Sequence, residues 1–189
     1  MRLSEIIYNI KNLAQGGITS DDLNLQDSQL AFEISYYRAK LLKQDQDKGR
    51  LNLELYKQNL GSVPLVQADK NECCNGEDCI LRTEVKIPTP LETHKGLNIT
   101  FVGTLGGQPF QKEYHNAAMW SSAAKYTGKN PTWYYQNGHI YLQNPPSMMI
   151  SHINIQGVFE RPEEAQKYRT CDCPENGEDC FSGYEFQYP

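Results

Sequence analysis

Apolar residues open the chain at helical spacing. Ile6, Ile10 and Leu13 recur every three or four positions, and Gly16-Gly17 interrupts the pattern. This spacing places the apolar side chains on one face of a helix, and glycine commonly ends helices. We therefore predict a first amphipathic helix that ends at these glycines.

A second, longer helix is predicted after a polar linker. Asp27 or Ser28 could supply the N-cap oxygen, and Gly49 is a suitable C-terminal stop. The apolar residues of this helix form one stripe, which consists of Leu30, Ile34, Tyr37 and Leu41. Because short helices need packing to be stable, we expect both helices to pack on each other, on the rest of the chain or on another subunit.

From residue 51 onward apolar and polar positions alternate, which predicts β-strands. Pro64 lacks a backbone N–H, so we place its segment at a sheet edge or at the start of a strand. The predicted strands cover residues 51–55, 63–67, 81–87, 98–105, 132–135, 140–142 and 149–159.

Asn137-Gly138 predicts a tight hairpin between two strands that are rich in aromatic residues. Asn-Gly favours the type I′ turn, whose twist matches that of antiparallel strands. Two further helices are predicted, one over the alanine-rich residues 115–126 and a short one that begins at Pro162.

These elements predict an α+β protein, because they do not alternate as βαβ units do. An N-terminal helical pair is followed by a largely antiparallel β domain with one inserted helix and a short C-terminal helix. We divide the chain into a helical hairpin for docking or oligomerisation (1–49), the β domain (50–170) and a cysteine-containing tail (171–189).

Charge and hydropathy argue against two classes of function, nucleic-acid binding and membrane insertion. The formal net charge of the 189 residues is -5 and no basic stripe is visible, which argues against a nucleic-acid grip because phosphate binding needs clustered cations. The sequence shows no apolar run long enough to span a bilayer and no signal-peptide pattern. We therefore expect synthesis in the cytosol, where thiols start reduced.

All 6 cysteines fall in two clusters that share the sequence Asn-Gly-Glu-Asp-Cys. The first holds Cys73, Cys74 and Cys79, and the second holds Cys171, Cys173 and Cys180. A bond between the clusters would fasten the two borders of the β domain, and it needs Cα separations under about 7 Å. Disulfides, a four-thiolate zinc site and free structural thiols all stay open as interpretations.

Catalysis is not expected from these residues. His139 and His152 lie in predicted strands that could face each other, but crowded cysteines are a poor setting for a nucleophilic thiol. No nucleophile elbow, P-loop, dinucleotide fingerprint or zinc-protease helix occurs in the sequence. We predict no catalytic residue and no cofactor, with zinc as the metal that the thiols could hold. The alternative functions are a thiol-rich metal-binding partner module and, behind it, a thiol hydrolase.

Tyrosine is frequent, with 12 residues in the chain. Tyrosine and tryptophan bury a large area at low entropic cost and therefore anchor many protein interfaces. The candidate interface residues are Leu30, Ile34, Tyr37 and Leu41 of the stripe, and Tyr134 and Tyr135 of the hairpin. Because aromatic residues also favour strands, the hairpin tyrosines fit a sheet equally well.

Several stretches together resemble one family. They are the helix over residues 29–44, NLGSVPLV (59–66), ECC (72–74), LRTEVKIP (81–88), KYTGK (125–129), the Asn137-Gly138 turn with Ile140-Tyr141, and NIQGVFE (154–160). This combination resembles the ring or adaptor proteins of the head-to-tail connector in short-tailed bacteriophages, particularly the crAss-like phages.

The resemblance implies a non-enzymatic virion protein that forms a homo-oligomeric ring, and a dodecamer would match the symmetry of the portal. Its partners would be the portal protein and the neighbouring connector or tail rings. Genomic DNA would pass through the lumen without sequence-specific binding, and no membrane would be involved. The helices would dock on the portal or the next ring, the β domain would build the tube wall, and assembly would take place in the bacterial host cytoplasm.

Overall fold

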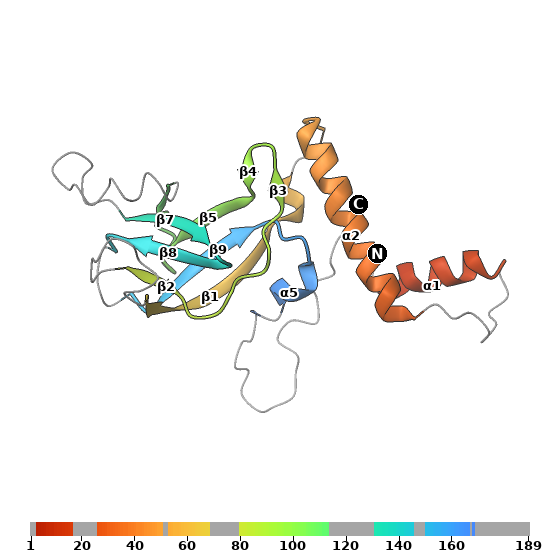
Figure 1. Cartoon of the computed structure of the whole chain (residues 1–189), viewed down its shortest axis with the longest axis horizontal. Helices are drawn as coiled ribbons and strands as arrows, with labels where there is room; N and C mark the ends of the chain where they lie inside the picture. The colour runs from red at the N-terminus through yellow and green to blue at the C-terminus, as the bar shows by residue number, and fades with distance from the viewer. Residues whose placement is uncertain are drawn as a thin grey trace, which may run out of the picture.

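A helical arm projects from a β domain in the computed structural model of the protein (Figure 1). The structure describes residues 3–16, 26–50, 53–68, 80–113, 131–145, 150–166 and 168. The order of elements in these residues confirms the predicted α+β class. The predicted helix over 115–126 and both cysteine clusters lie outside the described residues.

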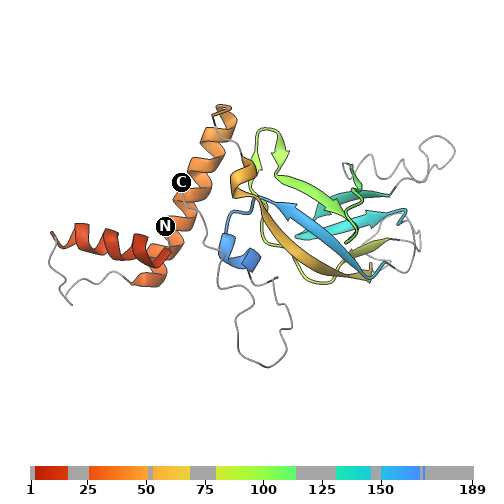
Figure 2. The same cartoon turned by 180° about the vertical axis from the view of Figure 1, so that it is seen from behind.

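The arm consists of helices α1 (Leu3–Ala14) and α2 (Asp27–Asp47). α1 lies beside the N-terminal part of α2, on the side away from the sheet (Figure 2). An ion pair between Lys11 and Asp27 joins the last turn of α1 to the first turn of α2. Both charges also suit the helix dipoles, because a cation is favourable at a helix C-terminus and an anion at an N-terminus.

The two ends of α2 differ in how well the sequence predicted them. Gln26 is the N-cap and its side chain makes no cap hydrogen bond, so the predicted cap at Asp27 or Ser28 is wrong by a residue or two. The predicted stop at Gly49 is confirmed, since this glycine has a φ of 66°. The N–H groups of Gly49 and Arg50 donate to the carbonyls of residues 46 and 45 at 2.9 and 2.8 Å, which forms a Schellman motif.

Within the described residues, seven strands form one sheet in the order β5-β9-β1-β2-β8-β7-β6, and a separate hairpin consists of β3 and β4. Neighbouring strands in the sheet run antiparallel except for β6 and β7. The strands are β1 (Gln58–Gln67), β2 (Leu81–Thr83), β3 (Glu92–Thr93), β4 (Gly96–Leu97), β5 (Ile99–Gly103), β6 (Gln111–Lys112), β7 (Thr132–Gln136), β8 (His139–Gln143) and β9 (His152–Gly157).

The sheet curls until its two edges meet. Gly103 at the end of β5 pairs with Pro109, and the N–H of Phe110 donates to the carbonyl of Val102 at 2.8 Å. The same segment runs directly into β6, so edge strands β5 and β6 are tied to each other. The interior is filled by side chains from both halves of the curled sheet, including Leu60, Val63, Val102, Trp133, Ile140, Leu142, Ile153, Ile155 and Phe159.

The predicted hairpin is confirmed. Asn137 and Gly138 have φ angles of 53° and 86°, as the two central positions of a type I′ turn require. The flanking strands β7 and β8 pair without interruption from Thr132 with Gln143 to Gln136 with His139.

Three details of the predicted strands are wrong. Leu53–Tyr56 forms a 3-10 helix (η1), and its Tyr56 packs at the root of the arm. The strand that begins at Leu81 ends at Thr83, although Ile87 still reaches the core. Pro64 lies inside central strand β1, at the point where β1 stops pairing with β9 and starts pairing with β2, so its missing N–H interrupts neither ladder.

The short helix α5 (Pro162–Gln166) starts at the predicted proline. Its residue Ala165 is buried in the core, so this helix covers one end of the curled sheet.

Candidate interaction surface

The face that joins α2 to the β domain is not the predicted apolar stripe. Leu42, which is 1% exposed, packs with Leu91 and Val158 of the β domain, and Ala39 and Tyr56 border this cluster. The buried positions of α2 are Ser35, Arg38 and Leu42, which repeat at helical spacing. A sequence scan for apolar residues misses this face because two of its three buried members are polar.

Hydrogen bonds hold the polar members of this face. The Arg38 guanidinium donates to the carbonyl of Phe159 at 3.3 Å, and the Ser35 hydroxyl donates to the Glu163 carboxylate at the same distance. Both bonds reach acceptors in the segment from Phe159 to α5, so they fix the orientation of α2 as well as its position.

The predicted stripe faces elsewhere. Leu30 and Ile34 are half-buried, whereas Tyr37 and Leu41 are 55% and 50% exposed. The stripe is therefore partly used within the arm, and its C-terminal half lies in solvent.

Exposed apolar side chains gather on the arm. Among the described residues, nine large apolar side chains are at least half exposed. Six belong to the arm: Tyr8, Leu13, Phe32, Tyr36, Tyr37 and Leu41; the other three are Leu55, Val85 and Leu105. Scattered exposed apolar residues are ordinary, but a concentration on one projecting element is typical of a surface that contacts a partner.

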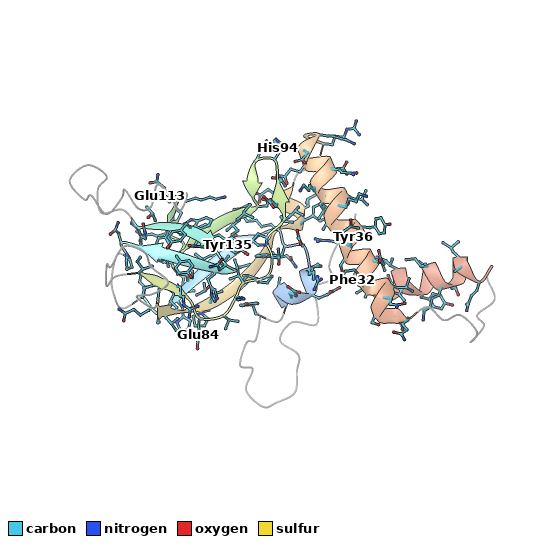
Figure 3. All side chains as sticks on the ribbon, viewed as in Figure 1. Phe32, Tyr36, Glu84, His94, Glu113 and Tyr135 are labelled. Atoms are coloured by element: carbon cyan, nitrogen blue, oxygen red, sulfur yellow. The ribbon has the colours of Figure 1, made fainter. Side chains whose placement is uncertain are left out.

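A groove of about 330 Å³ lies where α2 meets the β domain. Phe32 and Tyr36, one turn apart on α2, form part of its wall, and Leu91 and Arg161 line it from the β domain (Figure 3). The Arg161 guanidinium lies 5.4 Å from the centre of the Phe32 ring, in cation–π contact.

The hairpin tyrosines are used inside the chain. Tyr134 is 5% exposed and stacks on Tyr141, with ring centres 5.1 Å apart. It is therefore not a surface anchor. Tyr135 is half-buried and packs against the main core. Burial, with a smaller effect of Glu160, raises the pKa of Tyr135.

The two histidines considered for catalysis do not face each other. His139 is in β8 and His152 is in β9, with β2 and β1 between them in the sheet. His139 is buried with Nδ1 2.9 Å from the Thr83 carbonyl and Nε2 3.4 Å from the Arg82 guanidinium. Since Nδ1 must donate to the carbonyl, Nε2 is left to accept from Arg82, and the ring acts as a structural link between β8 and β2.

The predicted thiol chemistry stays a prediction, because all six cysteines lie outside the described residues. Within the part of the chain that the structure describes, no group of three or more His, Cys, Asp or Glu side chains is arranged to hold a metal ion. No helix in the same described ranges is long and apolar enough to cross a membrane.

Two comparisons with known proteins identify the family of the chain. A search of curated proteins found no match. A family model of the crAss ring proteins, described as phage tail ring protein 2, matches residues 5–189, which includes most of α1, all of α2 and each strand of the described residues. The match confirms the resemblance seen in the sequence, and the chain belongs to the family of phage tail ring protein 2.

Proposed function

We propose that this protein assembles into a homo-oligomeric ring of the head-to-tail connector, and that the phage genome passes through the lumen of this ring during ejection. Membership in a tail ring family supports a structural, non-enzymatic role in the virion. The observation that carries the proposal is the concentration of exposed apolar side chains on the projecting helical arm.

The arm and the β domain would have different tasks. The β domain has its own core and its edge strands are tied to each other, so it is complete as a single subunit. The arm contacts this domain through one face of α2, around Leu42, and leaves Tyr37 and Leu41 largely in solvent. We assign the arm to contacts with a neighbouring subunit, the portal or an adjacent ring, and the β domain to the wall of the tube.

The charge of the chain fits a passage for DNA better than a grip on it. With a formal net charge of -5, the subunit does not attract phosphates overall. A duplex could then move through the ring, because it would not gain the free energy of counterion release that holds DNA on a DNA-binding protein.

The test is the mass of the assembly in solution. We expect wild-type protein, alone or mixed with the portal, to form closed rings, with 12 subunits if the ring follows the portal symmetry assumed from the family. The variant Y37E/L41E should remain monomeric, because charges would be placed on the face assigned to the contact. Mass photometry and electron microscopy of both proteins measure this.

A matched control uses V85E/L105E, which places the same charges at β-domain side chains that are 53% and 58% exposed. The control should assemble as wild type does. If wild-type protein stays monomeric with the portal and the adjacent ring protein present, the ring proposal is wrong. If both variants assemble equally well, the assignment of the contact to the arm is wrong.

A further inference from the structure

We propose that the groove between α2 and the β domain binds residues 171–189 of the same subunit. These residues lie outside the described part of the chain, so the inference rests on the chemistry of the groove and on the sequence of the segment. It does not depend on ring formation, since it concerns one chain.

The groove carries an excess of positive charge. Lys40, Lys43 and Arg161 line it, against the single carboxylate of Glu160. Arg161 is paired with Glu164, with Nη1 and Oε1 3.1 Å apart. Among the described residues, no carboxylate lies within ion-pair distance of Lys40 or Lys43. The Lys40 ammonium instead lies 5.9 Å from the centre of the Tyr37 ring, and Lys43 acts on Asp47 only at longer range. Within the described ranges, these two cations of the groove therefore have no carboxylate in direct contact.

The groove also presents aromatic surface. Phe32 and Tyr36 are both 55% exposed, and buried Leu91 lies between α2 and the sheet at the same place. Aromatic rings beside ammonium groups are a suitable binding surface for a peptide that combines carboxylates with aromatic side chains, since each ring can bury area while the charges pair at the rim.

Residues 171–189 have that composition. The segment contains no Lys or Arg. Its acidic residues are Asp172, Glu175, Glu178, Asp179 and Glu185, and its aromatic residues are Phe181, Tyr184, Phe186 and Tyr188. The two properties of the groove are thus matched by one continuous stretch of the same chain.

The tether favours binding within one subunit. Arg161, which lines the groove, precedes Cys171 by only ten positions in the chain. A segment attached so close to its site has an effective concentration of about a millimolar, which exceeds that of a segment from another molecule at ordinary protein concentrations. Ten extended residues span about 35 Å, so the tether is long enough to return the segment to the groove.

A photo-cross-linker in place of Phe32 tests the proposal. We expect Phe32→p-benzoylphenylalanine to cross-link to residues 181–188 in full-length protein, as mapped by mass spectrometry. The same cross-linker at Leu105, which is 58% exposed on the β domain, is the control and should not label that segment. Mixing isotopically heavy and light protein shows whether the two linked peptides come from one chain.

Charge reversal in the groove adds a second measurement. K40E/K43E should lower the cross-link yield at position 32 at least threefold, whereas K48E/K95E, with the same change in net charge at exposed lysines outside the groove, should leave it unchanged. Adding E178K/D179K to K40E/K43E should restore part of the yield.

Three results would overturn the proposal. They are an absence of cross-links from position 32 to residues 171–189, cross-links only between heavy and light chains, and cross-links that appear only to DNA added to the sample. Ring assembly of the same protein can be measured separately, so failure here leaves the proposed connector role intact.

Discussion

Asp47 and His94 connect the C-terminal end of α2 to the β3–β4 hairpin. The Asp47 carboxylate accepts hydrogen bonds from His94 Nδ1 at 2.6 Å and from the His94 backbone N–H at 3.2 Å. The side-chain bond, followed by the backbone bond, lowers the pKa of Asp47 below its ordinary value of 3.8. One carboxylate therefore serves two donors of a single residue.

The lowered pKa predicts how this contact responds to acid. A carboxyl whose pKa is lower in the folded state stabilises it fully above the unfolded value of 3.8, and this stabilisation is lost as the pH falls through the folded value. We therefore expect hydrogen-exchange protection at the end of α2 to fall as the pH drops below the ordinary carboxyl value of 3.8.

D47N should remove the part of this pH dependence that comes from the pair. E33Q, at an exposed position of the same helix, is the control for a lost carboxylate and should keep the wild-type profile. An unchanged acid profile in D47N would show that the pair does not anchor the helix.

At the scale of elements, one face of α2 packs against the β domain and a neighbouring face lies in solvent. Leu42 is buried against the β domain, and its sequence neighbour Leu41, on an adjacent face of the helix, is half exposed. The two leucines are chemically identical, so their environments alone should decide their contribution to stability.

Leu42→Ala should destabilise the docked arm by about 2–5 kcal/mol, because it removes buried methyl groups and leaves a cavity. Leu41→Ala should change stability by less than about 0.5 kcal/mol, as is usual for surface positions. Hydrogen exchange can locate the effect, because exchange should accelerate in α2 of Leu42→Ala while the amides of Ile153 and Ile155 in the core stay protected. Equal effects of the two substitutions would contradict the assignment of the faces.

Some features of α2 could be predicted from the sequence and others could not. Its C-terminal end was predictable because Gly49 adopts a left-handed conformation that glycine tolerates. The Asn137-Gly138 hairpin was predictable for the same local reason. The docking face was not, because apolar periodicity cannot identify a buried Arg38 whose acceptor, the Phe159 carbonyl, is 121 positions away.

The candidate surface was predicted only in part. Tyr37 and Leu41 are exposed on the arm, but Tyr134 is buried by Ile80 and Tyr141, which the sequence places far from it or across the turn. The groove itself could not be predicted from the sequence, because it forms only where α2 meets Leu91 and Arg161.

For the whole molecule, the overall charge predicts weak interaction with DNA. We expect fluorescence anisotropy with a labelled duplex to show no binding tighter than about micromolar at physiological salt. A chain without a net positive charge displaces few counterions from the DNA and so gains little free energy of binding. K40E/K43E should behave as wild type in this measurement. Tight binding that weakens steeply with added salt would contradict free passage of the genome.

The tied edges of the sheet have a consequence for how copies can add to one another. Open strand edges are templates on which further chains can pair without limit. Here β5 and β6 are linked through Pro109 and Phe110, so this route to endless growth is restricted in the described domain. Copies of this domain would then have to join through side-chain surfaces at these two edges, and the angles between those surfaces would decide whether an assembly closes.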